Sequence, residues 1–422
     1  MRQNKCWFRM GKTLAVLAMA LMLPTGAGAA SKYNVLHRFT SKDGVVTNTS
    51  VFDAAGNLYG TTLKVVYKLA PNSHGSWTES VLYRFCSLKN CADGDAPTTL
   101  IFDAAGNLYG TTQLGGGFGD GTVFKLTPNS DGSWTESVLY SFTGGADGRQ
   151  PLYGGVIFDA TGNLYGTASG GGDLACNAPS GCGVVFKLTL NSHGSWTESV
   201  LYSFTGGADG QSPSDVGVIF DATGNLYGTA SGGGDLACNA PSGCGVVFKL
   251  TPNSHGSWTE SVLYSFTGGA DGAYPASGLV FDSAGSLYGT TPSGGNLSDC
   301  INGCGVVFKL TPNSDGSWTE SVLHSFANHP AANPYTGLVF DATGNLYGTT
   351  LYGGPVNGGV VFKMAAKSDG SWAYGLLHVF LGKPAKNPDG GLVLDKVGNL
   401  YGPTLGCGSG YKCQGVVFEI TP

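Results

Sequence analysis

The chain has 422 residues and a formal net charge of −6; only 12% of its residues are charged, whereas 70 are glycine. Basic residues are few and scattered, which excludes the charge pattern typical of a nucleic-acid-binding protein. Abundant glycine with few helix formers favours short strands joined by many turns and argues against a helical domain.

The first 30 residues have the pattern of a secretory signal peptide. Four basic residues within positions 1–12 precede the apolar run "LAVLAMALML" at 14–23, which is followed by small residues up to Ala30. The run is short for a membrane span, so we predict cleavage near Ala30 rather than a retained anchor. Without those four residues the chain keeps 18 basic and 28 acidic side chains, a net charge of −10. We expect an exported mature protein, residues 31–422, with no membrane span.

One motif recurs seven times in the mature chain, for example as "FDATGNLYGT" at 340–349. Its aspartates stand 50 to 62 residues apart: Asp53, Asp103, Asp159, Asp221, Asp282, Asp341 and Asp395. Each opens a short turn, where a carboxylate can accept backbone N–H bonds. We therefore interpret these aspartates as structural turn residues rather than ligands.

Each repeat contains four segments that read as strands, A to D. "GLVFD" and "NLYGTT" flank the motif turn, and "GVVFKLTPN" (245–253) and "GSWTESVLYSF" (256–266) follow. Four-strand units repeated seven times predict an all-β, seven-bladed β-propeller of antiparallel blades over residues 31–422, and a solenoid is the alternative.

The two ends of the mature chain complement each other. "SKYNVLHRF" at 31–39 resembles a lone strand D, and "GVVFEITP" at 415–422 stops after strand C. We predict that the N-terminal strand completes the last blade and closes the ring.

A four-residue loop between strands C and D would place Lys125 opposite Glu136. The same rule pairs Lys68 with Glu79, Lys187 with Glu198, Lys249 with Glu260 and Lys309 with Glu320. Opposite charges facing each other across strands are favourable, so these charges are predicted to be structural.

Ten of the eleven cysteines fall in the mature chain, as five neighbouring pairs: Cys86/Cys91, Cys176/Cys182, Cys238/Cys244, Cys300/Cys304 and Cys407/Cys413. An even count in an exported chain favours disulfides, and no pair has a nearby second pair to complete a tetrahedral metal site. Bridges this short stiffen their loops more than they stabilise the fold.

The units "GLVFDATGNLYGTT" and "GGVVFKLTP" resemble those of the choice-of-anchor tandem-repeat GloVer proteins of bacteria, and more distantly NHL propellers. The resemblance covers residues 31–422 and implies an exported repeat protein, in many members with a C-terminal surface anchor. This chain departs from that pattern by ending at Pro422 inside the last blade. The resemblance supplies no catalytic residues.

The predicted candidate face carries the D–A and B–C loops, which vary between repeats and hold every cysteine pair, since ligands bind on loops placed by a rigid scaffold. The candidate ligand-binding residues are Asp93, Asp147, Asp209 and Asp271 in D–A turns, and Asp173, Asn177, Asp235 and Asn239 in B–C loops. An ordinary Asp-Gly turn is the alternative for the first four. Residues 167–189 recur unchanged at 229–251, so any binding is expected to be multivalent, and recent duplication without selection for function is the alternative explanation.

Three function classes follow, in order of preference: a secreted module that binds carbohydrate or another surface ligand, a structural or adhesion scaffold, and a polysaccharide-active enzyme. No catalytic motif is visible, and the six glutamates all lie on predicted strands, which counts against the enzyme. We predict an extracellular glycan as the partner of a monomeric protein without a cofactor; calcium at the aspartates is the alternative, although no specific calcium-binding motif accompanies them.

Overall fold

The computed structural model describes residues 31–422 except 47, 49, 153, 214–216 and 408–413. The predicted signal peptide lies outside the described residues, as does Cys413. Among the residues that are described, no helix has the length and apolar character needed to cross a membrane.

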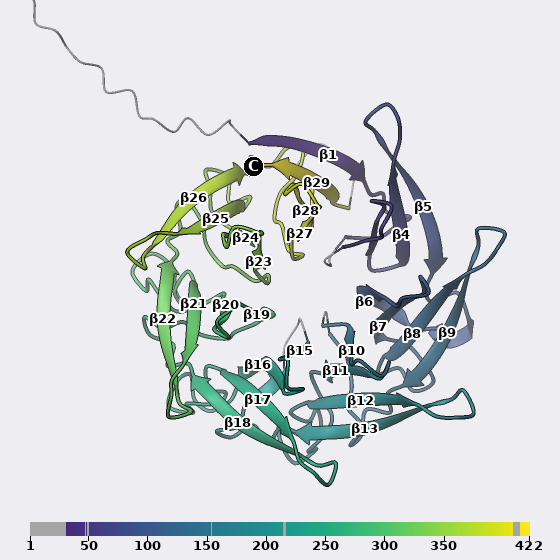
Figure 1. Ribbon diagram of the computed structural model, residues 1–422, viewed down its shortest axis with the longest axis horizontal. Coiled ribbons are helices and arrows are strands. Elements are labelled where there is room, and N and C mark those ends of the chain that lie inside the picture. The colour runs from purple at the N-terminus through teal and green to yellow at the C-terminus, as the bar shows by residue number, and fades with distance from the viewer. Residues whose placement is uncertain (1–30, 47, 49, 153, 214–216, 408–413) are drawn as a thin grey trace, which may run out of the picture. The chain divides into compact units, whose positions relative to one another are not determined.

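Residues 31–422 form a seven-bladed β-propeller, as the sequence predicts (Figure 1). In each blade, strand A is innermost and strand D outermost. Blades 1 to 3 comprise β2 (Val51–Phe52), β3 (Leu58–Thr61), β4 (Val65–Pro71) and β5 (Trp77–Arg84); β6 (Asp95–Phe102), β7 (Leu108–Leu114), β8 (Thr122–Pro128) and β9 (Trp134–Ser141); and β10 (Val156–Phe158), β11 (Leu164–Ala168), β12 (Val184–Leu190) and β13 (Trp196–Ser203).

Blades 4 to 6 repeat this order. They comprise β15 (Ile219–Phe220), β16 (Leu226–Gly232), β17 (Val246–Pro252) and β18 (Trp258–Ser265); β19 (Val280–Phe281), β20 (Leu287–Thr291), β21 (Val306–Pro312) and β22 (Trp318–Ser325); and β23 (Val339–Phe340), β24 (Leu346–Thr350), β25 (Val360–Ala366) and β26 (Trp372–Val379). Two short elements lie in D–A segments: a 3-10 turn, η1 (Lys89–Cys91), and β14 (Gln211–Pro213), which pairs with β16.

The N-terminal strand closes the ring, which confirms the prediction. Blade 7 consists of β27 (Val393–Leu394), β28 (Leu400–Thr404), β29 (Val416–Thr421) and β1 (Lys32–Arg38). The strands β1 and β29 are antiparallel, with Tyr33 opposite Ile420 and Asn34 opposite Glu419. The first and last strands of the chain therefore share one sheet (Figure 1).

The hydrophobic core lies between successive blades. One cluster joins Tyr109 and Phe142 of blade 2 to Leu164 and Phe186 of blade 3. The glycine of the motif makes room for it, because a Cβ on Gly166 would lie 2.7 Å from the Phe186 ring. The "LYG" segment common to all seven repeats thus specifies close packing of strands B and C.

The motif aspartate builds the A–B turn, as predicted. In blade 3, Asp159 accepts hydrogen bonds from the backbone N–H groups of Thr161 (2.8 Å) and Asn163 (2.9 Å). It also accepts from the Asn163 amide (2.7 Å) and the Tyr165 hydroxyl (3.1 Å). Burial alone would raise the pKa of Asp159, but these hydrogen bonds outweigh it and lower the pKa to about 2.

The predicted lysine–glutamate pairs are wrong. Lys125 lies opposite Ser137, and Glu136 lies opposite Leu126. The same shift puts Lys68, Lys187, Lys249 and Lys309 opposite serines. Because side chains alternate along a strand, a slip of one residue moves each glutamate to the opposite face of its sheet.

The cause of the slip is a five-residue C–D loop in place of the predicted four. In blade 2 the backbone N–H of Asn129 donates to the Ser133 carbonyl (2.8 Å), so residues 129–133 form the loop. Gly132 takes a φ of +87°, a conformation that favours glycine, and this accommodates the extra residue.

Candidate functional site

Three of the predicted D–A aspartates hold their own turns together. Asp147 accepts hydrogen bonds from the Tyr140 hydroxyl (2.8 Å) and from the backbone N–H (2.8 Å) and hydroxyl of Thr143. Asp209 and Asp271 accept the same three bonds from their own tyrosine and threonine. These contacts give the carboxylates a structural role, and a ligand contact there stays a prediction.

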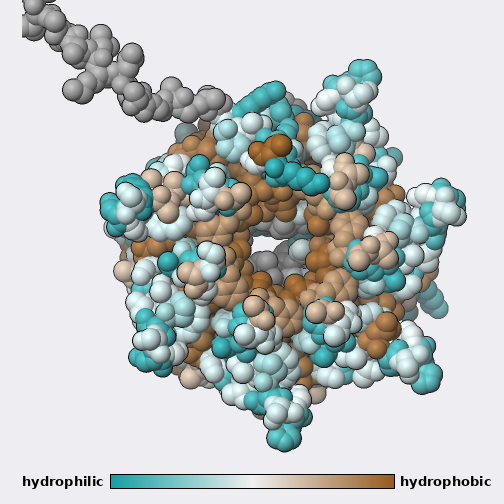
Figure 2. All heavy atoms as spheres, in the orientation of Figure 1, coloured by the Kyte–Doolittle hydropathy of each residue, from teal (hydrophilic) through white to brown (hydrophobic). Residues whose placement is uncertain are grey.

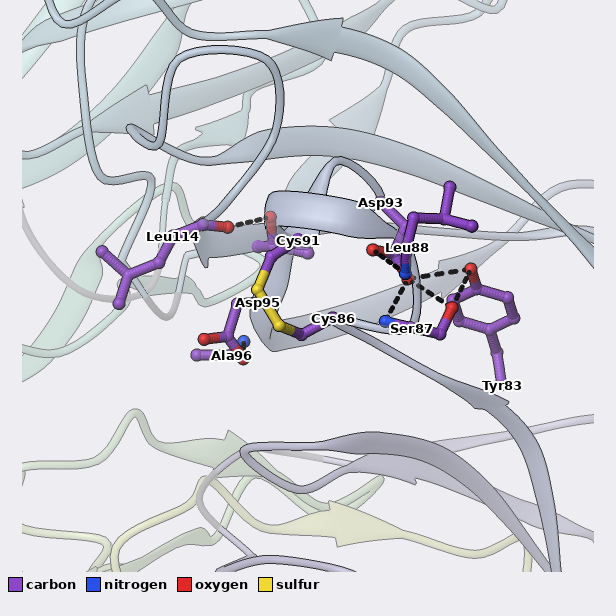
Figure 3. Close-up of a disulfide and its surroundings, with 10 residues drawn as sticks. Tyr83, Cys86, Ser87, Leu88, Cys91, Asp93, Asp95, Ala96 and Leu114 are labelled. Carbon is purple, nitrogen blue, oxygen red and sulfur yellow. Dashed lines mark hydrogen bonds between the residues drawn. A yellow bond between two sulfur atoms is a disulfide. The ribbon is translucent and has the colours of Figure 1, made fainter.

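The fourth, Asp93, is buried beside a disulfide (Figure 3). Its carboxylate accepts bonds from the Tyr83 hydroxyl (3.0 Å), the Ser87 N–H (2.9 Å) and hydroxyl (2.8 Å), and the Leu88 N–H (3.2 Å). Burial would raise the pKa of Asp93, but the hydrogen bonds from Ser87 and Leu88 lower it below its ordinary value. Asp93 is fully engaged within the protein.

The duplicated B–C loops place their polar residues near solvent. Asp173 and Asp235 each cap a tight turn, accepting a bond of 2.9 Å from the backbone N–H two residues ahead. Asn177 and Asn239 are exposed and both take a φ of +50°. The two loops have the same local geometry, as their identical sequences require.

Four of the five predicted disulfides are present: Cys86–Cys91, Cys176–Cys182, Cys238–Cys244 and Cys300–Cys304. Cys407 is disulfide-bonded, but its predicted partner Cys413 lies outside the described residues. The side chain of Asp95 lies near the Cys86–Cys91 sulfurs (Figure 3). Those sulfurs are bonded to each other and so are not thiolate metal ligands.

The opposite face, formed by the A–B and C–D turns, carries grooves between blades that sequence reasoning missed. The groove between blades 3 and 4 has a volume of about 510 Å³. Asp159, Tyr165 and Lys187 of blade 3 line one side, and Phe220 and Trp258 of blade 4 line the other. In Figure 2, hydrophobic surface surrounds the central opening, and hydrophilic tips project from the rim.

Aromatic side chains and one charge pair define this groove. The Tyr165 ring centroid lies 5.0 Å from that of Phe220 and 6.3 Å from that of Trp258, both edge to face. The ammonium of Lys187 lies 5.2 Å from the Tyr165 ring centroid. Burial and the nearby charge of Asp159 raise the pKa of Tyr165, so its hydroxyl stays protonated and donates to Asp159.

A second groove, between blades 7 and 1, uses the same positions and has a volume of about 790 Å³. Asp395 and Tyr401 come from blade 7, and Phe52 and Trp77 come from blade 1. The Tyr401 ring centroid lies 5.0 Å from that of Phe52 and 6.1 Å from that of Trp77.

The trio of tyrosine, phenylalanine and tryptophan recurs at six of the seven blade junctions. Besides the two grooves above, it comprises Tyr59, Phe102 and Trp134; Tyr109, Phe158 and Trp196; Tyr227, Phe281 and Trp318; and Tyr288, Phe340 and Trp372. At the junction of blades 6 and 7, Leu394 takes the phenylalanine position beside Tyr347. The molecule therefore repeats one aromatic arrangement around its ring.

Solved structures with the same fold include two lyases. Virginiamycin B lyase from Staphylococcus aureus superposes with a TM-score of 0.53 at 14% identity, covering 93% of this chain and 99% of its own. A streptogramin B lyase gives 0.55 at 14% identity, with coverage of 93% and 97%. The extracellular domain of the one component system BT4673 from B. thetaiotaomicron gives 0.53 at 13% identity, with coverage of 92% and 42%. At these identities the likeness concerns the fold alone.

No curated protein matches the sequence. The family model described as the Gloeobacter/Verrucomicrobia repeat matches residues 25–238 and 174–418, which together span nearly the whole propeller. The chain therefore belongs to the Gloeobacter/Verrucomicrobia repeat family.

Proposed function

We propose that this protein is an exported carbohydrate-binding module whose binding sites are the grooves between successive blades. The observation that carries the proposal is the aromatic trio repeated at six junctions, with a groove lined by aromatic and polar side chains at two of them. Binding sites are typically concave and apolar, with a few polar groups that fix the ligand's orientation.

The groove chemistry suits a sugar ring. The C–H face of a pyranose can pack on the partly exposed ring of Trp258, with the buried Tyr165 ring behind it, while its hydroxyl groups reach the Asp159 carboxylate and the Lys187 ammonium. Gly224 and Gly256 line the same groove, and a Cβ on either would meet no atom within 4 Å. The rim of the groove beside these two glycines therefore leaves room for an oligosaccharide longer than one sugar unit.

The repetition of the groove supports multivalent binding to a polymer. A shallow groove buries few ligand atoms, so each site alone is expected to be weak, with Kd on the order of millimolar. Once one unit of a polysaccharide is bound, the other grooves meet the chain at an effective concentration of about millimolar or above. The polymer is expected to bind far more tightly than its monosaccharide.

Export is part of the proposal. It is supported by the disulfides, which persist in oxidising compartments, and by the sequence pattern of residues 1–30. A glycan outside the cytoplasm is then the accessible partner.

A glycan array with the purified protein, followed by calorimetry on the best polysaccharide, tests the proposal. Trp258→Ala should weaken binding, and alanine at the tryptophans of all six aromatic trios should abolish it. Phe118→Ala is the matched control, because Phe118 is 66% exposed and lies in a B–C loop on the other face.

Two outcomes would overturn the assignment of the site. Loss of binding in an Asp173→Ala, Asp235→Ala double variant, with Trp258→Ala unchanged, would move the ligand to the loop face. Absence of binding to any glycan on the array would leave the scaffold function instead.

A further inference from the structure

Blade 7 breaks the charge pattern of the other grooves. In blades 1 to 6, a lysine on strand C lies opposite the strand B tyrosine: Lys68, Lys125, Lys187, Lys249, Lys309 and Lys363. In blade 7 the residue opposite Tyr401 is Glu419. One groove in the ring therefore has a carboxylate where six blades have an ammonium.

In the six common blades the lysine supplies positive charge beside the motif aspartate. Its Nζ atom lies 5.2 to 5.6 Å from the tyrosine ring centroid. In blade 5, Lys309 Nζ also lies 3.8 Å from Asp282 Oδ2. The charged residues that line the groove between blades 3 and 4 are Asp159 and Lys187, and these two balance.

In blade 7, two carboxylates converge on one hydroxyl. The Tyr401 oxygen lies 2.9 Å from Glu419 Oε1 and 3.1 Å from Asp395 Oδ2. A tyrosine has one proton, so it can donate to only one of these acceptors at a time. Asn34 donates to Glu419 Oε2 at 3.2 Å. Within the described part of the chain, no lysine, arginine or histidine nitrogen lies within 4.0 Å of either carboxylate.

The site is the aromatic groove itself, and the carboxylates set its charge. Phe52, Trp77 and Tyr401 line the cavity of about 790 Å³, the larger of the two grooves described. Its lining also includes Asp53, Asp395 and the exposed Lys396, with Glu419 directly behind the Tyr401 hydroxyl. Two carboxylates and one ammonium thus line this groove, and Glu419 adds a third negative charge behind Tyr401.

We propose that the groove between blades 7 and 1 binds a sugar unit carrying a protonated amino group, whereas the lysine-containing grooves bind neutral units. The inference rests on the proposed carbohydrate function. An ammonium offers three donors to carboxylate acceptors and is attracted to aromatic faces, so this groove satisfies both properties of the ligand. In the other grooves the lysine repels the same group.

Calorimetry with two matched probes tests this. A tetramer of β-1,4-linked glucosamine and its fully N-acetylated counterpart share one backbone and differ in the charge of the amine, which is protonated at about pH 6. The proposal predicts one site per molecule that prefers the glucosamine tetramer. Glu419→Gln, which keeps the shape of the side chain, should weaken that site about tenfold, since it removes one of the negative charges that attract the ammonium.

Two substitutions that reverse the charge at this position test the assignment further. Glu419→Lys restores the residue of the other blades and should abolish the preference for glucosamine. Lys187→Glu gives blade 3 the residue of blade 7 and should create a second glucosamine-preferring site. Binding of the N-acetylated tetramer to the remaining grooves shows that each variant is folded.

The outcomes separate this inference from the function on which it rests. The charge assignment is wrong, and the carbohydrate function stands, if the neutral tetramer binds through Trp258 but the affinity for the glucosamine tetramer is unchanged by Glu419→Gln and by Lys187→Glu. If neither tetramer binds and no other glycan binds either, both the charge assignment and the carbohydrate function are wrong.

Discussion

The imidazole Nε2 of His37 lies 3.6 Å from Glu79 Oε2, across the outer seam between the closing strand β1 and blade 1. The same seam recurs between other blades, where Glu136, Glu198, Glu260 and Glu320 each lie near a tyrosine of the preceding blade. In these four and in Glu79, the Oε1 atom is buried and accepts no hydrogen bond. The glutamates displaced by the five-residue loop thus line the blade junctions.

These glutamates should make stability depend on pH. Burial, and then the charge of Asp147 in the preceding blade, raises the pKa of Glu198 to about 7. The Tyr140 hydroxyl of the preceding blade lies close enough to Glu198 for the carboxylate to help raise the pKa of that tyrosine. Because the folded state holds this proton more tightly than the unfolded state, the stabilisation is complete below about pH 4.5 and is lost as the pH rises through 7.

Glu198→Gln isolates this effect. We expect the variant and the parent to have similar unfolding free energies at pH 5, and the variant to be more stable by about 1 kcal/mol at pH 8, after allowance for partial exposure. Urea denaturation at the two pH values measures the difference. A constant difference between the two proteins at both pH values would contradict the assignment.

Histidines at two further blade junctions should make the stability of the fold depend on pH in the opposite direction. The ring of His378 in blade 6 stacks on Tyr33 of the closing strand, with centroids 4.0 Å apart. Burial lowers the pKa of His378 to about 4. Its contribution is therefore present above about pH 6.5 and lost as the pH falls toward 4. His378→Phe should reduce the destabilisation of the parent between pH 6.5 and 4, measured as a smaller drop in Tm, and an unchanged drop would contradict this.

Gly166→Ala tests the close packing of strands B and C. Its Cβ would lie 2.7 Å from the Phe186 ring, so we expect a loss of about 1 to 3 kcal/mol from overpacking. Gly375→Ala is the control, because Gly375 also lies in a strand but a Cβ added there would meet no atom within 4 Å. Equal Tm values for the two variants would show that the packing tolerates the added methyl group.

Cys176→Ser with Cys182→Ser should affect one loop more than the whole fold. The bridge closes a short loop between residues six apart, so we expect a loss of about 2 kcal/mol or less in global stability. Limited proteolysis should instead show faster cleavage within residues 173–183. The unaltered copy at 235–245 is the internal control, and equal cleavage of both loops would contradict a local effect.

The number of blades, the closure by β1 and the four described disulfides could be predicted because each follows from residues repeated in the sequence or adjacent in it. The turn role of Asp159 was likewise predictable from its place before a glycine. The C–D register was not, because whether Ser133 ends the loop or begins the strand depends on one backbone hydrogen bond to Asn129.

The grooves escaped prediction for a different reason. Tyr165 and Trp258 meet across a junction between two repeats and are 93 positions apart in the sequence. Each residue alone fits the apolar pattern of its own strand, and their pairing requires the order of the blades in space. The available signal was that every repeat from blade 1 to blade 6 offers a tryptophan at the start of strand D.

Intrinsic tryptophan fluorescence tests the central claim most directly. Every tryptophan of residues 31–422 belongs to an aromatic trio at a blade junction: Trp77, Trp134, Trp196, Trp258, Trp318 and Trp372. Titration with a glycan that calorimetry shows to bind should therefore give a saturable change in tryptophan emission with the same midpoint. Binding of that glycan without any change in emission would contradict the assignment of the grooves as carbohydrate sites.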